Sequence, residues 1–209
     1  YLEHAARLVP RSELYRLVSL SEDRAADLHE EIALFDPIRS GLAQRDLAPP
    51  RPVRARGQEL ARDLLAASDA EPADRIAAIQ IAEDLRLSDL EPQLTDLLAR
   101  TGRSADVRVE AAEALGVIAP TRALERLTTV LTDSSEGIAF RRRLVGPISG
   151  LSGENADERL AELLPELPYD VQVEVAAALS GSRSGAQQLL DGVTDSGVPA
   201  TLLVERNVA

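Results

Sequence analysis

Few side chains in this 209-residue chain could do chemistry, and its two histidines come first. His4 and His29 could bind zinc or haem iron, but they fall on different predicted helices and lack the short spacing of a metal-ligand pair. We predict that His4 lies at or near the surface of a helix, and that His29, followed by Glu30 and Glu31, lies on a solvated acidic face. The chain has no cysteine, which excludes disulfides, thiolate zinc sites, thioether-linked haem and a cysteine nucleophile.

The segment 146–153 is rich in glycine and serine and could suggest a phosphate-binding loop or a nucleophile elbow. A phosphate-binding loop ends in Gly-Lys-Ser or Gly-Lys-Thr, and this chain has no lysine, because all 23 basic residues are arginine. An elbow needs Gly-x-Ser-x-Gly after a strand. We predict instead that the segment kinks and ends a helix, and we do not expect Ser149 or Ser152 to act as a nucleophile. The sequence thus predicts no catalytic residue, no metal site and no cofactor site, so the protein is not expected to be an enzyme.

Three arginines recur 33 residues apart, at Arg75, Arg108 and Arg141. We predict that they form a ladder of hydrogen bonds between successive repeats; the alternative is an anion-binding stripe along one surface. Arg141 also begins the only run of basic residues, and the two arginines after it could face solvent, an acidic partner or a neighbouring glutamate.

The elements that would position these residues follow from a 33-residue repeat between about residues 73 and 166. Apolar residues recur in register at the spacing of one helix face, and a second helical stripe follows each of the first. Two short helices cannot bury their apolar faces alone, so neighbouring helical hairpins must stack. Leucine and alanine dominate the apolar residues and aromatics make up only 2%, which favours helix. The predicted fold is all-α, an α-solenoid. The aligned positions are Ile79, Ala112 and Val145; Ala82, Leu115 and Ile148; Leu85, Ile118 and Leu151; Leu94, Leu127 and Leu160; Leu97, Val130 and Leu163; and Leu98, Leu131 and Leu164.

Two regions are predicted. Residues 1–53 form an irregular N-terminal helical region, with helices at 2–18 and 22–35 and an extended proline-rich connector at 47–53. Residues 54–209 form the repeat array, with degenerate units on either side of the clear ones, the last being a hairpin of 169–179 and 185–193. Within the clear units, helices break at 87–89, 119–121 and 152–155. Pro120 fits a first helical turn, and Ser88 and Asn155 could be N-caps.

The charge of the chain limits its partners. The formal net charge is −12, so phosphate backbones are repelled and we expect no nucleic-acid partner. There is no run of about 18 apolar residues, and we expect no insertion into a membrane. The chain begins without methionine, so we expect a fragment of a longer protein. Its oligomeric state cannot be predicted.

The segment 106–118, Asp-Val-Arg-Val-Glu-Ala-Ala-Glu-Ala-Leu-Gly-Val-Ile, resembles the first helix of HEAT-like repeats of the phycobilisome-lyase type. That resemblance implies a solenoid of HEAT-like hairpins. Most such families are non-catalytic scaffolds that bind proteins, whereas the lyases hold a tetrapyrrole. A tetrapyrrole (bilin) lyase or chaperone is therefore the alternative function, although no cysteine or histidine pocket supports it.

Segments 1–7, 185–193 and 197–199, together with the repeats between them, resemble the middle region of bacterial PVC-type c-type cytochromes. These extracytoplasmic proteins carry a membrane-bound dehydrogenase propeller upstream and a haem domain downstream. The resemblance implies a periplasmic spacer that contacts flanking domains of its own chain or another protein. The family's catalytic and haem-ligand motifs have no match here, so no functional residue is carried over.

Overall fold

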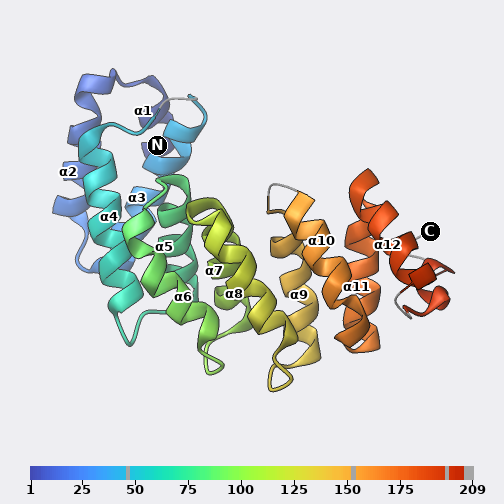
Figure 1. The fold of residues 1–209 in the computed structure, drawn as a ribbon. Coiled ribbons are helices and arrows are strands. Elements are labelled where there is room, and N and C mark those ends of the chain that lie inside the picture. Colours follow the sequence, from blue (N-terminus) through green and yellow to red (C-terminus); the bar gives the residue numbers. More distant parts are fainter. Residues whose placement is uncertain (46–47, 152–153, 196–197, 205–209) are drawn as a thin grey trace. The chain divides into compact units, whose positions relative to one another are not determined.

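The computed structural model describes residues 1–45, 48–151, 154–195 and 198–204. Every regular element in these ranges is a helix, so the predicted all-α class is confirmed (Figure 1). The helices pack as neighbouring pairs in a solenoid-like repeat fold. They group into two compact units, an N-terminal unit of Tyr1–Leu97 and a C-terminal unit of Leu98–Ala209. The predicted boundary at residues 53 and 54 falls inside a helix of the first unit.

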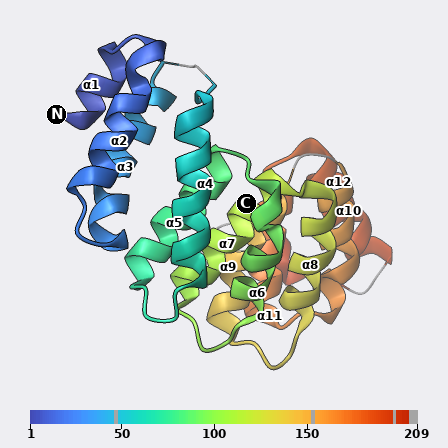
Figure 2. The same cartoon turned by 90° about the vertical axis from the view of Figure 1, so that its left-hand side faces the viewer.

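The N-terminal unit has helices in two layers (Figure 2). Helices α1 and α2 both pack on α3, while α2 also packs on α4, and α5 packs on both α3 and α4. The elements are α1 (Leu2–Leu8), η1 (Arg11–Glu13), α2 (Leu14–Arg24), α3 (Leu28–Ala43), α4 (Arg51–Ala66), α5 (Pro72–Asp84), η2 (Ser88–Leu90) and α6 (Glu91–Ala99), in which the division between the units falls.

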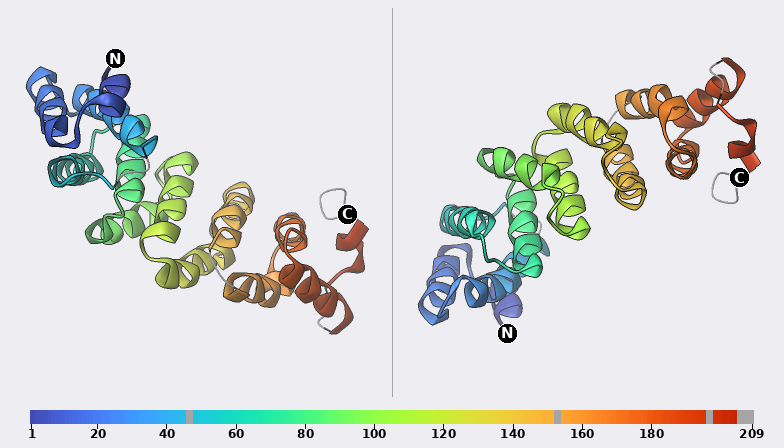
Figure 3. Two further views of the ribbon diagram at one scale, coloured as in Figure 1. Left: turned by 90° about the horizontal axis from the view of Figure 1, so that it is seen from above. Right: turned by 90° about the horizontal axis from the view of Figure 1, so that it is seen from below.

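The C-terminal unit repeats one arrangement three times (Figure 3). Helix α9 packs against both α7 and α11 in one layer, and α10 packs against both α8 and α12 in the other. Its elements are α7 (Ala105–Ile118), α8 (Pro120–Thr132), α9 (Ile138–Ser149), α10 (Glu154–Leu163), η3 (Leu164–Glu166), α11 (Tyr169–Ser180), α12 (Arg183–Asp195) and η4 (Ala200–Val204). The last two helices confirm the predicted final hairpin.

The predicted apolar stripes form the core. Every aligned position is buried except Ile118 and Val130, which are half-buried. Pro120 is the first residue of α8, as predicted. The two predicted N-caps are wrong: Ser88 lies inside η2, and Asn155 lies inside α10. Ser152 and Gly153 of the predicted break fall outside the described residues.

The N-terminal helices differ from the predicted ones because of local capping and proline chemistry. The predicted helix 2–18 is broken at Val9, which is extended because it precedes Pro10. The predicted helix 22–35 is wrong as well: α2 ends at Arg24, and Asp27 caps a new helix by accepting a 2.9 Å hydrogen bond from the backbone N of Glu30.

The predicted connector 47–53 is shorter than expected. Residues 48–50 are not helical, but α4 begins at Arg51 and holds Pro52 in its first turn, where a missing N–H costs nothing. Leu47 lies outside the described residues. Proline thus begins this helix rather than excluding it.

Candidate functional site

Arg75, Arg108 and Arg141 each occupy the fourth residue of a helix, in α5, α7 and α9, and all three are buried. Each guanidinium donates to a backbone carbonyl at or just beyond the end of the preceding helix. Arg108 Nε lies 2.8 Å from Leu98 O, Arg141 Nε lies 2.6 Å from Leu131 O, and Arg75 donates to Ala67 and Ala70. The last carbonyls of a helix have no hydrogen-bond donor within the helix. These arginines supply the missing donors. Their burial excludes the alternative of an exposed anion-binding stripe.

Gln172 takes the same place in α11 and was not predicted. It is the fourth residue of that helix, it is buried, and its Nε2 donates to Leu164 O at 3.0 Å. The 33-residue register missed it because the last hairpin is shifted and the residue is not arginine. Gln172 could have been predicted from its position four residues into the helix, which it shares with the three arginines.

Arg108 also makes a second set of contacts, with a carboxylate and an aromatic ring. Its two terminal nitrogens donate to Glu136, one at 2.9 Å, and its guanidinium carbon lies 3.8 Å from the centre of the Phe140 ring. All three residues are at least nine-tenths buried. A planar guanidinium suits both a two-point bond to a carboxylate and stacking on an aromatic ring. This cluster fixes the segment before α9 against α7.

The basic run at residues 141–143 reaches three different helices. Arg141 bonds the end of α8, Arg142 donates to Glu174 of α11 at 2.8 Å, and Arg143 lies 2.8 Å from Asp106 of α7. Among the alternatives for the two extra arginines, neighbouring carboxylates are therefore the observed partners. Both pairs are well exposed, so each contributes at most about 1 kcal/mol.

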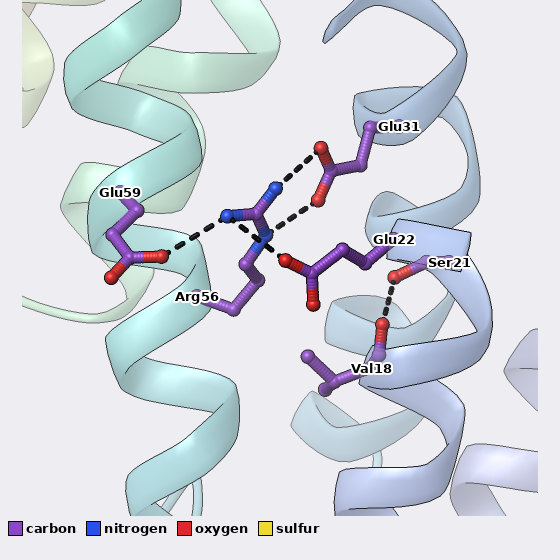
Figure 4. Close-up of polar contacts among 6 residues, drawn as sticks. All are labelled: Val18, Ser21, Glu22, Glu31, Arg56 and Glu59. Atoms are coloured by element: carbon purple, nitrogen blue, oxygen red, sulfur yellow. Dashed lines mark hydrogen bonds and ion pairs between the residues drawn. The ribbon is translucent and has the colours of Figure 1, made fainter. Parts of the chain in front are cut away.

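The N-terminal unit has a partly buried charge cluster of its own, which the sequence analysis missed (Figure 4). Arg56 of α4 binds Glu31 of α3 through Nε and one terminal nitrogen, each 2.6 Å from a carboxylate oxygen. The other terminal nitrogen lies 3.0 Å from Glu59 and 3.6 Å from Glu22. The hydrogen bond to Glu31, opposed by burial and supported by Glu59, raises the pKa of Arg56 above its ordinary range. Arg56 thus joins α4 to both α3 and α2.

An open cleft of about 450 Å³ lies in the same unit, between the start of α3 and the connection from α4 to α5. His29 Nδ1 lies 2.8 and 2.9 Å from the two carboxylate oxygens of Asp74, which is buried at the start of α5. The hydrogen bond to Asp74 is the main cause of a raised pKa at His29. The predicted acidic surroundings of His29 are present, but its partner comes from 45 residues away.

The structure does not gather the histidines into a metal centre. Within the part of the chain that the structure describes, no three His, Asp or Glu residues are placed to hold a metal ion. His4 is exposed on α1. Ser149 ends α9, and its hydroxyl donates to Gly146 O at 3.0 Å within the same helix, while Ser152 lies outside the described residues.

Comparisons with protein-family models, curated proteins and solved structures gave no match. None of the helices in the described ranges has the length and apolar character needed to cross a bilayer.

Proposed function

We propose that the chain is a non-catalytic HEAT-like scaffold that binds a protein or flanking domains of its own polypeptide, as a spacer in a larger bacterial electron-transfer protein. The observation that carries the proposal is the recurrent polar residue at the fourth position of α5, α7, α9 and α11, bonded to the end of the helix before it. Such bonds fix the spacing of successive helical pairs. A spacer needs that property, because the distance between its ends depends on it.

The side chains that could do chemistry are used to hold helices together, which supports a scaffold over an enzyme. Arg56, Arg108 and Arg141 bind buried carboxylates or helix-end carbonyls, and His29 binds Asp74. These contacts leave shape and surface charge as the means of recognition. With a formal charge of −12, the chain favours a partner surface that carries basic residues.

Crosslinking of the full-length polypeptide tests the proposal directly. Because the chain has no lysine, amine-reactive reagents would miss it, and a dihydrazide that joins carboxyl groups suits its 35 acidic residues. We expect crosslinks from this segment to domains on both sides of it, identified by mass spectrometry. A segment that forms crosslinks only within itself, while the flanking domains crosslink to each other, would contradict the spacer function.

Pull-down with a matched surface variant tests recognition of a separate protein. Glu158 and Glu166 are exposed in the C-terminal unit, so E158Q/E166Q lowers the negative charge without touching the buried pairs. A partner held through surface charge should bind this variant more weakly and should be released by salt. If partner binding is unchanged in this variant and does not depend on salt, the acidic surface does not recognise the partner.

A further inference from the structure

The contact between His29 and Asp74 joins two helices that are far apart in sequence. His29 is in the first turn of α3, and Asp74 is the third residue of α5. The imidazole is about two-thirds exposed, whereas Asp74 is only 7% exposed. Burial of a carboxylate is unfavourable unless a partner balances its charge. Protonated His29 supplies that balance from the solvent side.

The charged side chains that line the cleft around His29 are acidic, and the nearby cation on α5, Arg75, is buried and bonded to the carbonyls of Ala67 and Ala70. From α3 and its cap come Asp27 and Glu30; from the connection before α5 come Asp69 and Glu71; α4 contributes only Leu64 to the cleft lining. Among the described residues that line the cleft, His29 is the one basic side chain. When the imidazole loses its proton, four carboxylates line the cleft without the positive charge of its one basic lining residue, while Arg75, the next residue of α5, stays bonded to the carbonyls of Ala67 and Ala70. The four carboxylates are those of Asp27, Asp69, Glu71 and Asp74.

We propose that His29 and Asp74 form a pH-responsive clasp between α3 and α5, which is tight when the imidazole is protonated and loosened when it is neutral. The neutral imidazole can still donate one hydrogen bond from Nδ1. It no longer offsets the buried carboxylate or the acidic rim of the cleft. Loosening should therefore begin at the first turn of α5 and the connection that precedes it. This regulation goes beyond scaffolding and does not depend on it.

The sign of the pH effect follows from the raised pKa of His29, caused first by its hydrogen bond to Asp74 and then by the charge of Asp74. An unfolded histidine titrates near pH 6.5. The stability contributed by the clasp is fully present below that value and is lost as pH rises through the higher pKa of the folded protein.

NMR titration of the whole chain tests the clasp, since only two imidazoles give signals. H4Q removes the other one. In that background we expect His29 to titrate at a higher pH than it does after Asp74→Asn. We also expect the protection factors of the α5 amides from Arg75 onward, which correct for the intrinsic rise of exchange with pH, to fall across the same pH interval. Equal titration midpoints with and without Asp74 would overturn the proposal. It would also be overturned if the protection of the α5 amides from hydrogen exchange did not change as His29 titrates.

Asp74→Asn could unfold the unit, so H29Q provides a second test with H4Q as its matched control. Both variants remove one imidazole, but only H29Q should abolish the fall in thermal midpoint between about pH 6 and 8, the interval around ordinary histidine titration. If H29Q retains the same fall as H4Q, His29 does not control the clasp.

Discussion

The two units each pair an arginine with a buried glutamate, but they place the two residues in opposite positions. In the N-terminal unit the fourth residue of α3 is Glu31, and Arg56 reaches it from α4. In the C-terminal unit the fourth residue of α7 is Arg108, and Glu136 reaches it from the segment before α9. Both pairs use two-point geometry and join different elements. The fourth position of α3 and of α7 therefore holds a charged residue paired across elements, and the pair can have either orientation of charge.

A second contrast lies in the helix-end carbonyls. Arg108 also donates to Leu98 O, so one side chain both pairs with a carboxylate and completes the end of the preceding helix. Glu31 is an acceptor and cannot do this. The arginine position can thus be repeated through a stack, as at Arg141, whereas the glutamate position is suited to one junction.

The largest expected effect is at Arg108. Arg108→Ala leaves Glu136 charged and buried and removes the donor to Leu98 O, so we expect a loss of about 3–5 kcal/mol of unfolding free energy. Urea unfolding followed by circular dichroism measures it, because the chain has no tryptophan. Arg143→Ala, which removes an exposed pair with Asp106, is the matched control and should lose at most about 1 kcal/mol. Equal losses would mean that burial of the pair is not what matters.

Replacement of Arg56 by alanine should also lower the free energy of unfolding, but by less than Arg108→Ala does. The Arg56 side chain is 20% exposed, so water can reach part of the site after Arg56→Ala, and we expect a loss of about 2–3 kcal/mol from the stranded Glu31. Arg62→Ala on the same helix removes an exposed pair with Asp89 and serves as the control, with a loss of at most about 1 kcal/mol. A loss at Arg56 larger than that at Arg108 would reverse the order of the two junctions.

Gln172 tests whether a neutral side chain at the fourth helical position is enough to stabilise the last hairpin. Gln172→Ala leaves Leu164 O without its side-chain donor in a buried place, so we expect a loss of about 1–2 kcal/mol by the same urea titration. Gln172→Arg asks whether the ladder accepts its usual residue there. If the alanine variant is as stable as the native protein, the Gln172 hydrogen bond does not hold the last hairpin.

The sequence predicted the regular part of the fold because stacking imposes one rule on every repeat. Each hairpin must bury the same two stripes, so the period of the apolar residues carries the helix positions, and Arg108 and Arg141 stay in register with it. The stripe weakens where Gln172 replaces arginine. There the constraint is a carbonyl at a helix end, which is a local requirement that a fixed period does not describe.

The N-terminal pairs could not be predicted in the same way. Glu31 and Arg56 are 25 residues apart, and His29 and Asp74 are 45 apart, with no repeat to relate them. Their meeting depends on where α3 begins, and the cap at Asp27 moves that start to Leu28. Because the chain has 35 acidic residues, the sequence does not show which of them are buried and paired and which are solvated.

Two helical glycines, one in each unit, should respond to alanine with effects of opposite sign. A Cβ added to Gly41 of α3 would lie 2.8 Å from the Cβ of Ala6 and would also meet the backbone of Glu3, because α1 crosses α3 there. At Gly192 of α12 the nearest atom to such a Cβ is a methyl of Val198, at an ordinary 3.5 Å. Gly41→Ala should cost about 1–3 kcal/mol through overpacking. Gly192→Ala should stabilise the chain by about 0.5–1 kcal/mol, since alanine loses less backbone entropy in a helix. Thermal midpoints of the two variants should shift in opposite directions, and a shift of the same sign would show that the α1–α3 crossing adapts to a side chain at Gly41.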